Sequence, residues 1–274
     1  MINKKNILGV GITDATKDEV LEYIAKNLEN FKKKLFFVTP NPEFLVLANK
    51  NLAFKNILNR ADLALADGIG LMIAAKILGK PLKSRFAGVD LVKSLCKEVS
   101  EKPITVGFLG GRDKVAERTA ECLMKKYPKL KIGFVGEEWP NDINARQSRV
   151  SDDAQLSSRG PAASFPPASA PLTVRAVGSP SSGVTPRTDI LFVAFGAPKQ
   201  EIWINENLKK IPVKIAIGVG GAFDYISGRI PRAPGFVRRI GFEWLFRLAN
   251  QPWRIKRQLS LIEFIWLVLK EKIK

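Results

Sequence analysis

The chain has 274 residues, 46% of them hydrophobic, and a formal net charge of +18 with no histidine. Length and composition allow one large domain or two small ones, and the positive charge favours anionic partners such as nucleic acid, anionic lipid or phosphorylated substrates. The sequence predicts neither a signal peptide nor a spanning helix, and Cys96 and Cys122 lie too far apart in the sequence to predict a metal or redox motif. We therefore expect a cytoplasmic protein that is soluble or peripheral to the membrane.

Short apolar strands and helices alternate along the chain. A capping box at 16–19 begins the first helix, and one continuous helix is predicted over 43–58, after Pro40 and Pro42 end a strand. Further helices are predicted at 69–79, 88–100, 113–127 and from about Pro198. Strands are predicted at 35–38, 62–66, 104–109, 130–135, 190–195 and 213–217. The pattern is typical of an α/β fold with a mostly parallel sheet and flanking helices.

Two regions break this alternation. Segment 148–188 is rich in Ser, Pro and Ala, contains no lysine or glutamate and shows no periodicity. It is either a disordered insertion or a stretch read in the wrong frame of the gene; the abrupt change of composition favours the second explanation, and we assign the segment no function. From about residue 236 the chain is helical, aromatic and basic. We therefore predict a core over 1–235 and a C-terminal appendage over 236–274.

Polar or glycine-rich loops follow four of the predicted strands. These loops are 39–41, 67–68, 196–201 and 218–221. In a parallel sheet they converge on the edge where α/β proteins bind ligands. Each loop taken alone is also typical of an ordinary turn. Four of them at one edge predict a ligand site.

Longer motifs around these loops point to a family. In chain order they are VTPNPE at 38–43, ADGIG at 66–70, RFAGVDL at 85–91, FGAPKQE at 195–201, GVGGAFD at 218–224, EWLFR at 243–247 and PWR at 252–254. Together they resemble the WecG/TagA/CpsF family of bacterial glycosyltransferases, over the whole chain except about 140–188. The resemblance implies a Rossmann-like core and an inverting enzyme that needs no metal and no cofactor.

The resemblance also implies a reaction and its residues. Family members typically transfer N-acetylmannosamine, or its uronic acid, to undecaprenyl-diphosphate-linked N-acetylglucosamine for teichoic acid or a related surface polymer, and we expect a UDP donor. By motif position Asp67 is the expected catalytic base. The expected donor-site residues are Thr39, Asn41, Arg85, Gln200, Gly220 and Gly221. The residues expected to bind the acceptor diphosphate are Arg247, Arg254 and Arg257.

An inverting transfer needs one base for the acceptor hydroxyl and positive or hydrogen-bond-donating groups for the departing UDP. Without histidine, a strand-end carboxylate such as Asp67 can be that base. Asp90 and Asp224 are rivals, although Asp90 is expected to cap the following helix and Asp224 either to bind ribose or to fix its loop. The close acidic pairs at 137–138 and 152–153 give no convincing metal site.

The tail is expected to reach the lipid acceptor. On one continuous helix Arg247, Arg254 and Arg257 would share a face, although Pro252 lies between them. The apolar run 259–269 is too short to span a bilayer, and with its aromatic and basic neighbours it suits an interfacial helix; an ordinary amphipathic helix packed on the core is the alternative. We expect association with the inner face of the cell membrane. The oligomeric state, including a homo-oligomer, stays open.

Two other functions compete with the transferase. A dinucleotide-dependent oxidoreductase would share the fold class, but the glycines of GFLGG at 107–111 lack the full dinucleotide-binding spacing. A basic protein that only binds nucleic acid or a membrane surface would explain the charge, but the basic residues form no known nucleic-acid module. We therefore expect no nucleic-acid partner.

Overall fold

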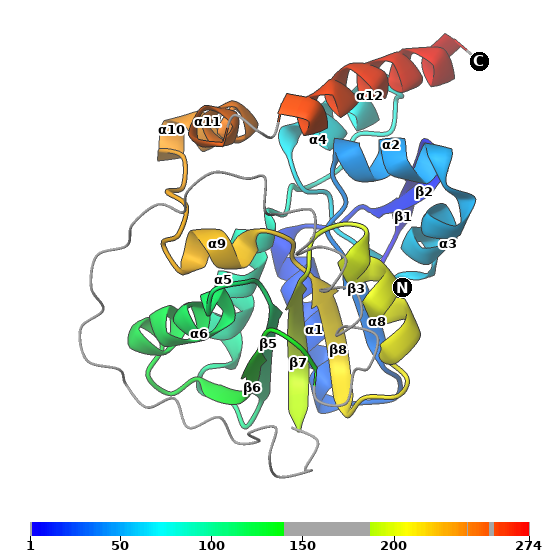
Figure 1. The fold of residues 1–274 in the computed structure, drawn as a ribbon. Helices are drawn as coiled ribbons and strands as arrows, with labels where there is room; N and C mark the ends of the chain where they lie inside the picture. The colour runs from blue at the N-terminus through cyan, green and yellow to red at the C-terminus, as the bar shows by residue number, and fades with distance from the viewer. Residues whose placement is uncertain (1, 140–186, 240, 252–254, 274) are drawn as a thin grey trace.

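The computed structural model describes residues 2–139, 187–239, 241–251 and 255–273, and Figure 1 shows a central sheet with helices on both faces. Six strands of the described residues form one parallel sheet in the order β4-β3-β8-β7-β5-β6. The strands are β3 (Leu35–Val38), β4 (Leu63–Ala64), β5 (Thr105–Gly110), β6 (Lys131–Gly136), β7 (Thr188–Ala194) and β8 (Val213–Gly218). The predicted α/β architecture is confirmed.

The strands are apolar on both sides because helices cover both faces of the sheet. Successive side chains of a strand point to opposite faces. In β3, Phe36 and Val38 therefore pack with α2, α3 and α8, whereas Leu35 and Phe37 pack with α1, α5 and α6. These helices are α1 (Lys17–Glu29), α2 (Pro42–Lys50), α3 (Leu52–Arg60), α5 (Gly88–Val99), α6 (Val115–Lys126) and α8 (Lys199–Asn207).

Local capping explains two outcomes in the N-terminal half. The predicted capping box is confirmed, since the Glu19 N–H donates to the Thr16 hydroxyl and the Thr16 N–H donates to the Glu19 carboxylate. The single helix predicted over 43–58 is wrong. Asn51 ends α2 and begins α3, because its side-chain oxygen accepts a 3.0 Å hydrogen bond from the Phe54 N–H.

A short hairpin at the N-terminus was not predicted. Strands β1 (Lys4–Ile7) and β2 (Val10–Thr13) pair antiparallel with each other. The Thr13 hydroxyl accepts a 2.9 Å hydrogen bond from the Ala64 N–H of β4, which holds the hairpin against the edge of the main sheet. The hairpin thus covers an edge that would otherwise be open to pairing with another chain.

The remaining helices surround the end of the sheet where β3, β4 and β8 finish. They are α4 (Ile69–Ile77), α9 (Ala222–Ile226), α10 (Gly235–Arg239), α11 (Glu243–Asn250) and α12 (Ile255–Ile273). Helix α12 packs against α2 and α4, and α10 and α11 lie beside it above the sheet (Figure 1). Among the helices that the structure describes, none combines the length and apolar content that a bilayer span requires.

The tail departs from the helix expected for its arginines. The chain forms two helices, since α11 ends at Asn250 and α12 begins at Ile255, with Pro252 between them. Arg247 therefore does not share one continuous helix with Arg257. Arg254 and residues 148–186 lie outside the described residues, as does the side chain of Arg257.

Candidate active site

A cavity of about 460 Å³ lies at the carboxyl ends of the strands. Loops after the neighbouring strands β4, β3 and β8 supply Asp67, Asn41 and Gly221 to its wall. Helices α4, α11 and α12 complete the enclosure. The volume is within the range of small-molecule sites, and its position is where parallel sheets bind ligands. The structure thus brings together three of the predicted strand-end residues.

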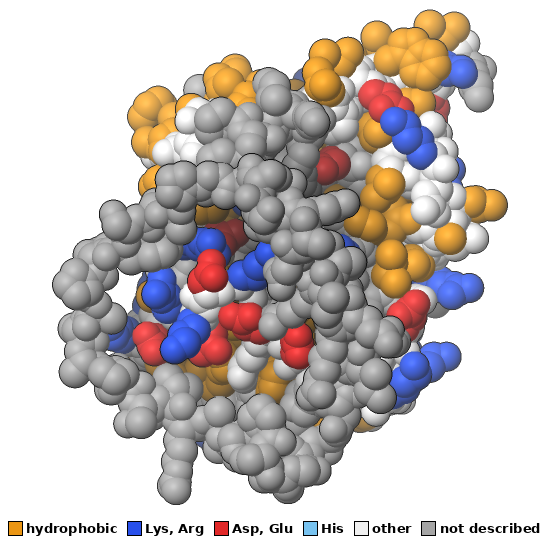
Figure 2. Space-filling view, in the orientation of Figure 1, with side chains coloured by type: hydrophobic (Ala, Val, Ile, Leu, Met, Phe, Trp, Pro, Cys, Tyr) orange, Lys and Arg blue, Asp and Glu red, His pale blue; other side chains and the backbone are white. Residues whose placement is uncertain are grey.

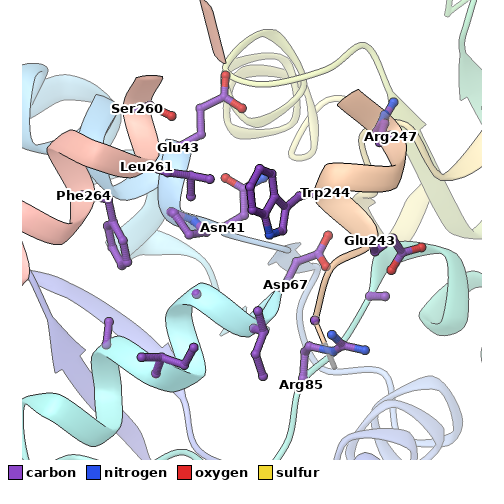
Figure 3. Close-up of a pocket in the computed structure, with 18 of the residues that line it drawn as sticks. Asn41, Glu43, Asp67, Arg85, Glu243, Trp244, Arg247, Ser260, Leu261 and Phe264 are labelled. Atoms are coloured by element: carbon purple, nitrogen blue, oxygen red, sulfur yellow. The ribbon is translucent and has the colours of Figure 1, made fainter. Parts of the chain in front are cut away.

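Asp67 is fixed by the turn between β4 and α4. Its backbone N–H donates to the Pro40 carbonyl at 2.8 Å. Gly68, the next residue, has a φ of 91°, which L side chains rarely adopt, and α4 begins directly after it. In Figure 3 the Asp67 side chain lies among Asn41, Arg85 and Glu243. The turn therefore presents one carboxyl group to the cavity.

The pKa of Asp67 is raised to about 7. Burial is the largest cause, because removal from water disfavours the charged form, and the negative charge of Glu243 adds to it. The positive charge of Arg85 and a hydrogen bond from the Gly88 backbone act in the opposite direction. A carboxyl group that titrates near neutral pH is suited to act as a general base.

Two arginines line the cavity from different parts of the chain. Arg85 precedes α5 and donates a 3.3 Å hydrogen bond to the Arg238 carbonyl of α10. Arg247 of α11 lies with its guanidinium carbon 5.0 Å from the centre of the Tyr225 ring. A Cβ atom on Gly221 would lie only 2.7 Å from an Arg247 nitrogen, so a glycine there permits this approach. These two guanidinium groups can meet an anionic ligand, in a cavity that the carboxyl groups of Glu43, Asp67 and Glu243 also line.

Arg232 connects the appendage to the core. Its guanidinium donates two hydrogen bonds to Asp90 of α5, at 2.7 and 2.8 Å, and one to Glu243 of α11 at 3.3 Å. The expected capping role of Asp90 is wrong, because α5 begins at Gly88, no side chain caps it, and Asp90 lies in its first turn. The Asp90 carboxylate is used by Arg232 instead. Arg232, which the two bonds to Asp90 anchor, thus also holds Glu243, whose negative charge adds to the effect of burial on the pKa of Asp67.

Thr39 and Gln200, both expected at the donor site, lie beneath the cavity and do not line it. The Thr39 hydroxyl donates to the Gly218 carbonyl at 2.9 Å. The Gln200 side-chain oxygen accepts from the N–H groups of Gly196 and Gly220, at 3.2 and 3.0 Å. Gly220 precedes Gly221 and does not line the cavity either. These residues hold the loops that follow β3, β7 and β8.

Glu201, the next residue, helps to hold the Gln200 side chain in place. Glu201 is fully buried, and its carboxyl accepts a 2.6 Å hydrogen bond from the Gln200 side-chain nitrogen. Burial raises the pKa of Glu201 to about 8, so the group is mostly neutral at pH 7. A neutral carboxyl can remain in the core without an ionic partner while it orients the Gln200 amide.

Asn41 both caps a helix and lines the cavity. Its side-chain oxygen caps α2 by accepting a hydrogen bond from the Phe44 N–H at 3.1 Å. Three residues without a predicted role, Glu243, Trp244 and Tyr225, also line the cavity. The motif at 243–247 contains Glu243 and Trp244 and could have identified them. Asp90 and Asp224, the rival bases, do not line it.

Among the described residues, no group of three or more histidine, cysteine, aspartate or glutamate side chains is arranged to hold a metal ion. The groups that could meet a charged ligand are instead the cavity arginines and the backbone at the helix N-termini. The expectation of a metal-independent reaction stays a prediction.

Sequence comparisons agree with this arrangement. The sequence model of the glycosyl transferase WecG/TagA/CpsF family matches residues 5–149 and 185–274. Three relatives are each named N-acetylglucosaminyldiphosphoundecaprenol N-acetyl-beta-D-mannosaminyltransferase. The protein of Bacillus spizizenii strain W23 is 32% identical over 99% of this chain and 91% of its own length. Those of Staphylococcus aureus MRSA252 and Bacillus subtilis 168 are 29% and 28% identical, over 99% and 92% of this chain and 94% and 86% of their own lengths.

The matched residues include both parts of the candidate site, the core loops that carry Asp67 and Arg85 and the appendage helix that carries Glu243 and Arg247. The cavity therefore lies in the region that the family shares and not in a segment peculiar to this chain. On this evidence the chain belongs to the WecG/TagA/CpsF family of glycosyltransferases.

Proposed function

We propose that this chain transfers N-acetylmannosamine, or a related hexosamine or uronic acid, from a UDP donor to undecaprenyl-diphosphate-linked N-acetylglucosamine during synthesis of a cell-surface polymer. The names of three relatives support this acceptor and this sugar, and the family supports a nucleotide-sugar donor. The observation that carries the proposal is the half-buried Asp67 carboxyl, with a pKa of about 7, in a cavity that two arginines line.

In the proposed reaction the Asp67 carboxylate takes the proton of the acceptor hydroxyl while the hydroxyl oxygen attacks the anomeric carbon of the donor sugar. The bond between that carbon and the phosphate oxygen breaks, and its electron pair leaves with UDP. Attack opposite the leaving group inverts the anomeric centre. Arg85, beside Asp67, and Arg247, over Gly221, supply positive charge for the two diphosphates in this reaction, that of the departing donor and that of the acceptor.

A donor screen tests this proposal directly. UDP-N-acetylmannosamine and other UDP-hexosamines are incubated with a short-chain lipid-diphosphate-N-acetylglucosamine, and products are identified by mass spectrometry. We expect an acceptor heavier by one N-acetylhexosamine, and no such product from Asp67→Asn. If no UDP-sugar is transferred and NAD binds instead, the oxidoreductase alternative replaces the transferase.

The same assay tests the need for metal. Because arginines line the cavity, transfer is expected to continue in the presence of a chelator. A rate that the chelator abolishes and Mg²⁺ or Mn²⁺ restores would contradict this part of the proposal.

We also propose that the appendage binds the inner face of the membrane. Among the described residues, all large exposed apolar side chains except Phe31, Leu52 and Ile202 lie on α4 or between residues 236 and 273. Figure 2 shows hydrophobic side chains gathered over α10, α11 and α12 along one side of the molecule. A broad exposed apolar surface usually marks an interaction site, and the net positive charge of the chain favours anionic lipid.

Liposome binding separates this surface from ordinary packing. Ile262 and Trp266 of α12 are 68% and 57% exposed and do not line the cavity. A double variant, Ile262→Glu and Trp266→Glu, should lose binding to anionic liposomes while the thermal unfolding temperature stays near that of the wild type. The double variant Leu52→Glu and Ile202→Glu, on the exposed surfaces of α3 and α8, adds the same two negative charges and is the matched control. Equal liposome binding by all three proteins would leave α12 as a packing helix.

A further inference from the structure

The cavity has two chemically different ends. Asp67, Arg85 and Arg247 lie at one end, whereas Figure 3 shows Leu261 and Phe264 of α12 on the other side of the cavity from Arg85. This second end extends between α4 and α12, and we name it the apolar arm. Its walls include Ile73, Ala74 and Ile77 of α4 and Phe264, Val268 and Leu269 of α12. All six side chains are purely hydrocarbon.

The apolar arm runs from the interior to the surface. Ala74 and Val268 are each 2% exposed, whereas Ile73 is 52% and Leu269 49% exposed. The exposed members belong to the same two helices, α4 and α12, as the surface proposed to meet the membrane. The apolar arm therefore connects the centre of the candidate active site with that surface.

A nucleotide sugar does not match the apolar arm. Its base, ribose, phosphates and sugar all carry polar groups, and burying such groups against hydrocarbon without hydrogen bonds is unfavourable. A hydrocarbon chain joined to a diphosphate matches both ends of the cavity, because the arginines suit the diphosphate and the apolar arm suits the chain.

We propose that the apolar arm binds the first isoprene units of the acceptor's polyprenyl chain, those next to its diphosphate. This inference rests on the proposed function, and it adds a lipid subsite inside the cavity to the surface that contacts the membrane. The enzyme would then recognise the acceptor lipid itself, and membrane attachment would only bring the enzyme close to that lipid.

Binding of two small diphosphates tests the inference without sugar transfer. Farnesyl diphosphate and methyl diphosphate share the same head and differ in the chain, and their dissociation constants are measured by calorimetry in the absence of membranes. We expect the wild type to prefer farnesyl diphosphate by about tenfold or more, since a single methylene group in an apolar pocket already changes discrimination about 10–200-fold.

Two variants of the apolar arm should reduce this preference. Ala74→Phe fills the space between α4 and α12 and should bring the affinity ratio toward one. Val268→Thr keeps the side-chain volume but places a hydroxyl in the apolar arm, so it should lower the ratio severalfold; it decides the question if Ala74→Phe fails to fold. Ile202→Phe, on the surface of α8 and outside the cavity, is the control and should keep the wild-type ratio.

The outcomes separate the inference from the proposed function. An unchanged ratio in both arm variants, or equal binding of the two diphosphates by the wild type, would overturn the inference even if sugar transfer is observed. Weaker liposome binding by Ala74→Phe with an unchanged ratio would assign the arm to a bilayer acyl chain. A preserved farnesyl preference without any sugar transfer would support the lipid subsite and overturn the proposed function.

Discussion

The core and the appendage build opposite sides of the cavity in different ways. The core presents Asp67 from a turn that backbone hydrogen bonds and a left-handed glycine fix in place. The appendage presents Glu243, Trp244 and Arg247 from α11, which has eight residues and no fully buried side chain. Its described contacts with the core include Arg232 to Glu243, Arg85 to the Arg238 carbonyl, and Arg247 over Tyr225.

This difference suggests that the two sides have different stabilities. Segments with few buried apolar contacts and mainly surface hydrogen bonds are those that open locally at low free-energy cost. We infer that the base side of the site is permanently formed, whereas the α11 side depends on a small number of ionic and cation–π contacts. Substitutions on the two sides of the cavity should therefore differ in the size of their effects.

Replacing the base should cause the largest loss. Asp67→Asn is expected to lower kcat by about 10²–10⁴, the usual cost of removing a general base, while donor binding persists. Because burial raises the pKa of Asp67 to about 7, the wild type should lose stability as the pH rises from about 4 to 7, and the whole loss is present at pH 8, where the variant should therefore unfold at a higher temperature. Initial rates and thermal unfolding measure both effects. Near-normal turnover would remove Asp67 from the base role.

The α11 side should be sensitive to one arginine. Arg247→Met is expected to lower kcat/KM by about 10²–10³, since it removes positive charge from the diphosphate region. Gly221→Ala should also lower kcat/KM, by a smaller factor, because the new Cβ atom would displace the Arg247 guanidinium without altering any charge. The φ angle of Gly221 is −76°, which an alanine adopts without backbone strain. If Arg247→Met left kcat/KM unchanged, the arginine would serve only to pack on Tyr225.

The link between α5 and α11 should have an intermediate effect. Arg232→Met and Asp90→Asn are each expected to lower kcat/KM by about tenfold, because each disrupts the bidentate contact that anchors Arg232, the residue that holds Glu243. If the two residues act only through this contact, the double variant should be no slower than the worse single variant. Additive losses in this double-mutant cycle would show that the two side chains act separately.

The pH dependence should move in opposite directions for the two charged neighbours of Asp67. The acidic limb of kcat/KM is expected near pH 7 in the wild type, because only the ionised carboxylate accepts a proton. Glu243→Gln removes a negative charge and should lower the pKa, which moves the limb to lower pH. Arg85→Met removes a positive charge and should move it to higher pH. A limb that stays in place in both variants would mean that another group controls the rate.

The smallest effect is expected beneath the site. Glu201→Gln should change kcat/KM by about twofold or less, because the buried carboxyl is already mostly neutral at pH 7 and the new amide keeps a carbonyl oxygen for Gln200. Wild-type stability should fall as the pH rises from about 4.5 to 8, where the unfolded chain ionises Glu201 and the folded chain does not. The variant should show a weaker decline in chemical denaturation. A large loss of activity would indicate that Glu201 acts as an ionised group.

Local sequence patterns were sufficient for much of the core. The capping box at 16–19 and the short apolar strands, such as Leu35–Val38, depend on nearest neighbours and on alternation along the chain, so their positions could be predicted. The break at Asn51 and the N-terminal hairpin could not, because a side-chain cap overrides helical periodicity and the hairpin is held by a contact with β4.

For the candidate site, the strand pattern was enough to predict three of the loops that line the cavity, because parallel strands place all their carboxyl ends at one edge of the sheet; the fourth predicted loop, 196–201, does not line it. Asp67, Asn41 and Gly221 follow from that rule, and the motifs added Arg85 and Arg247. The folded chain was needed to show that Thr39 and Gln200 lie beneath the cavity and that Glu243 lies close enough to Asp67 to raise its pKa. Burial and charge act between residues that the fold brings together, and Glu243 lies far from Asp67 along the chain, so no local pattern could reveal their interaction.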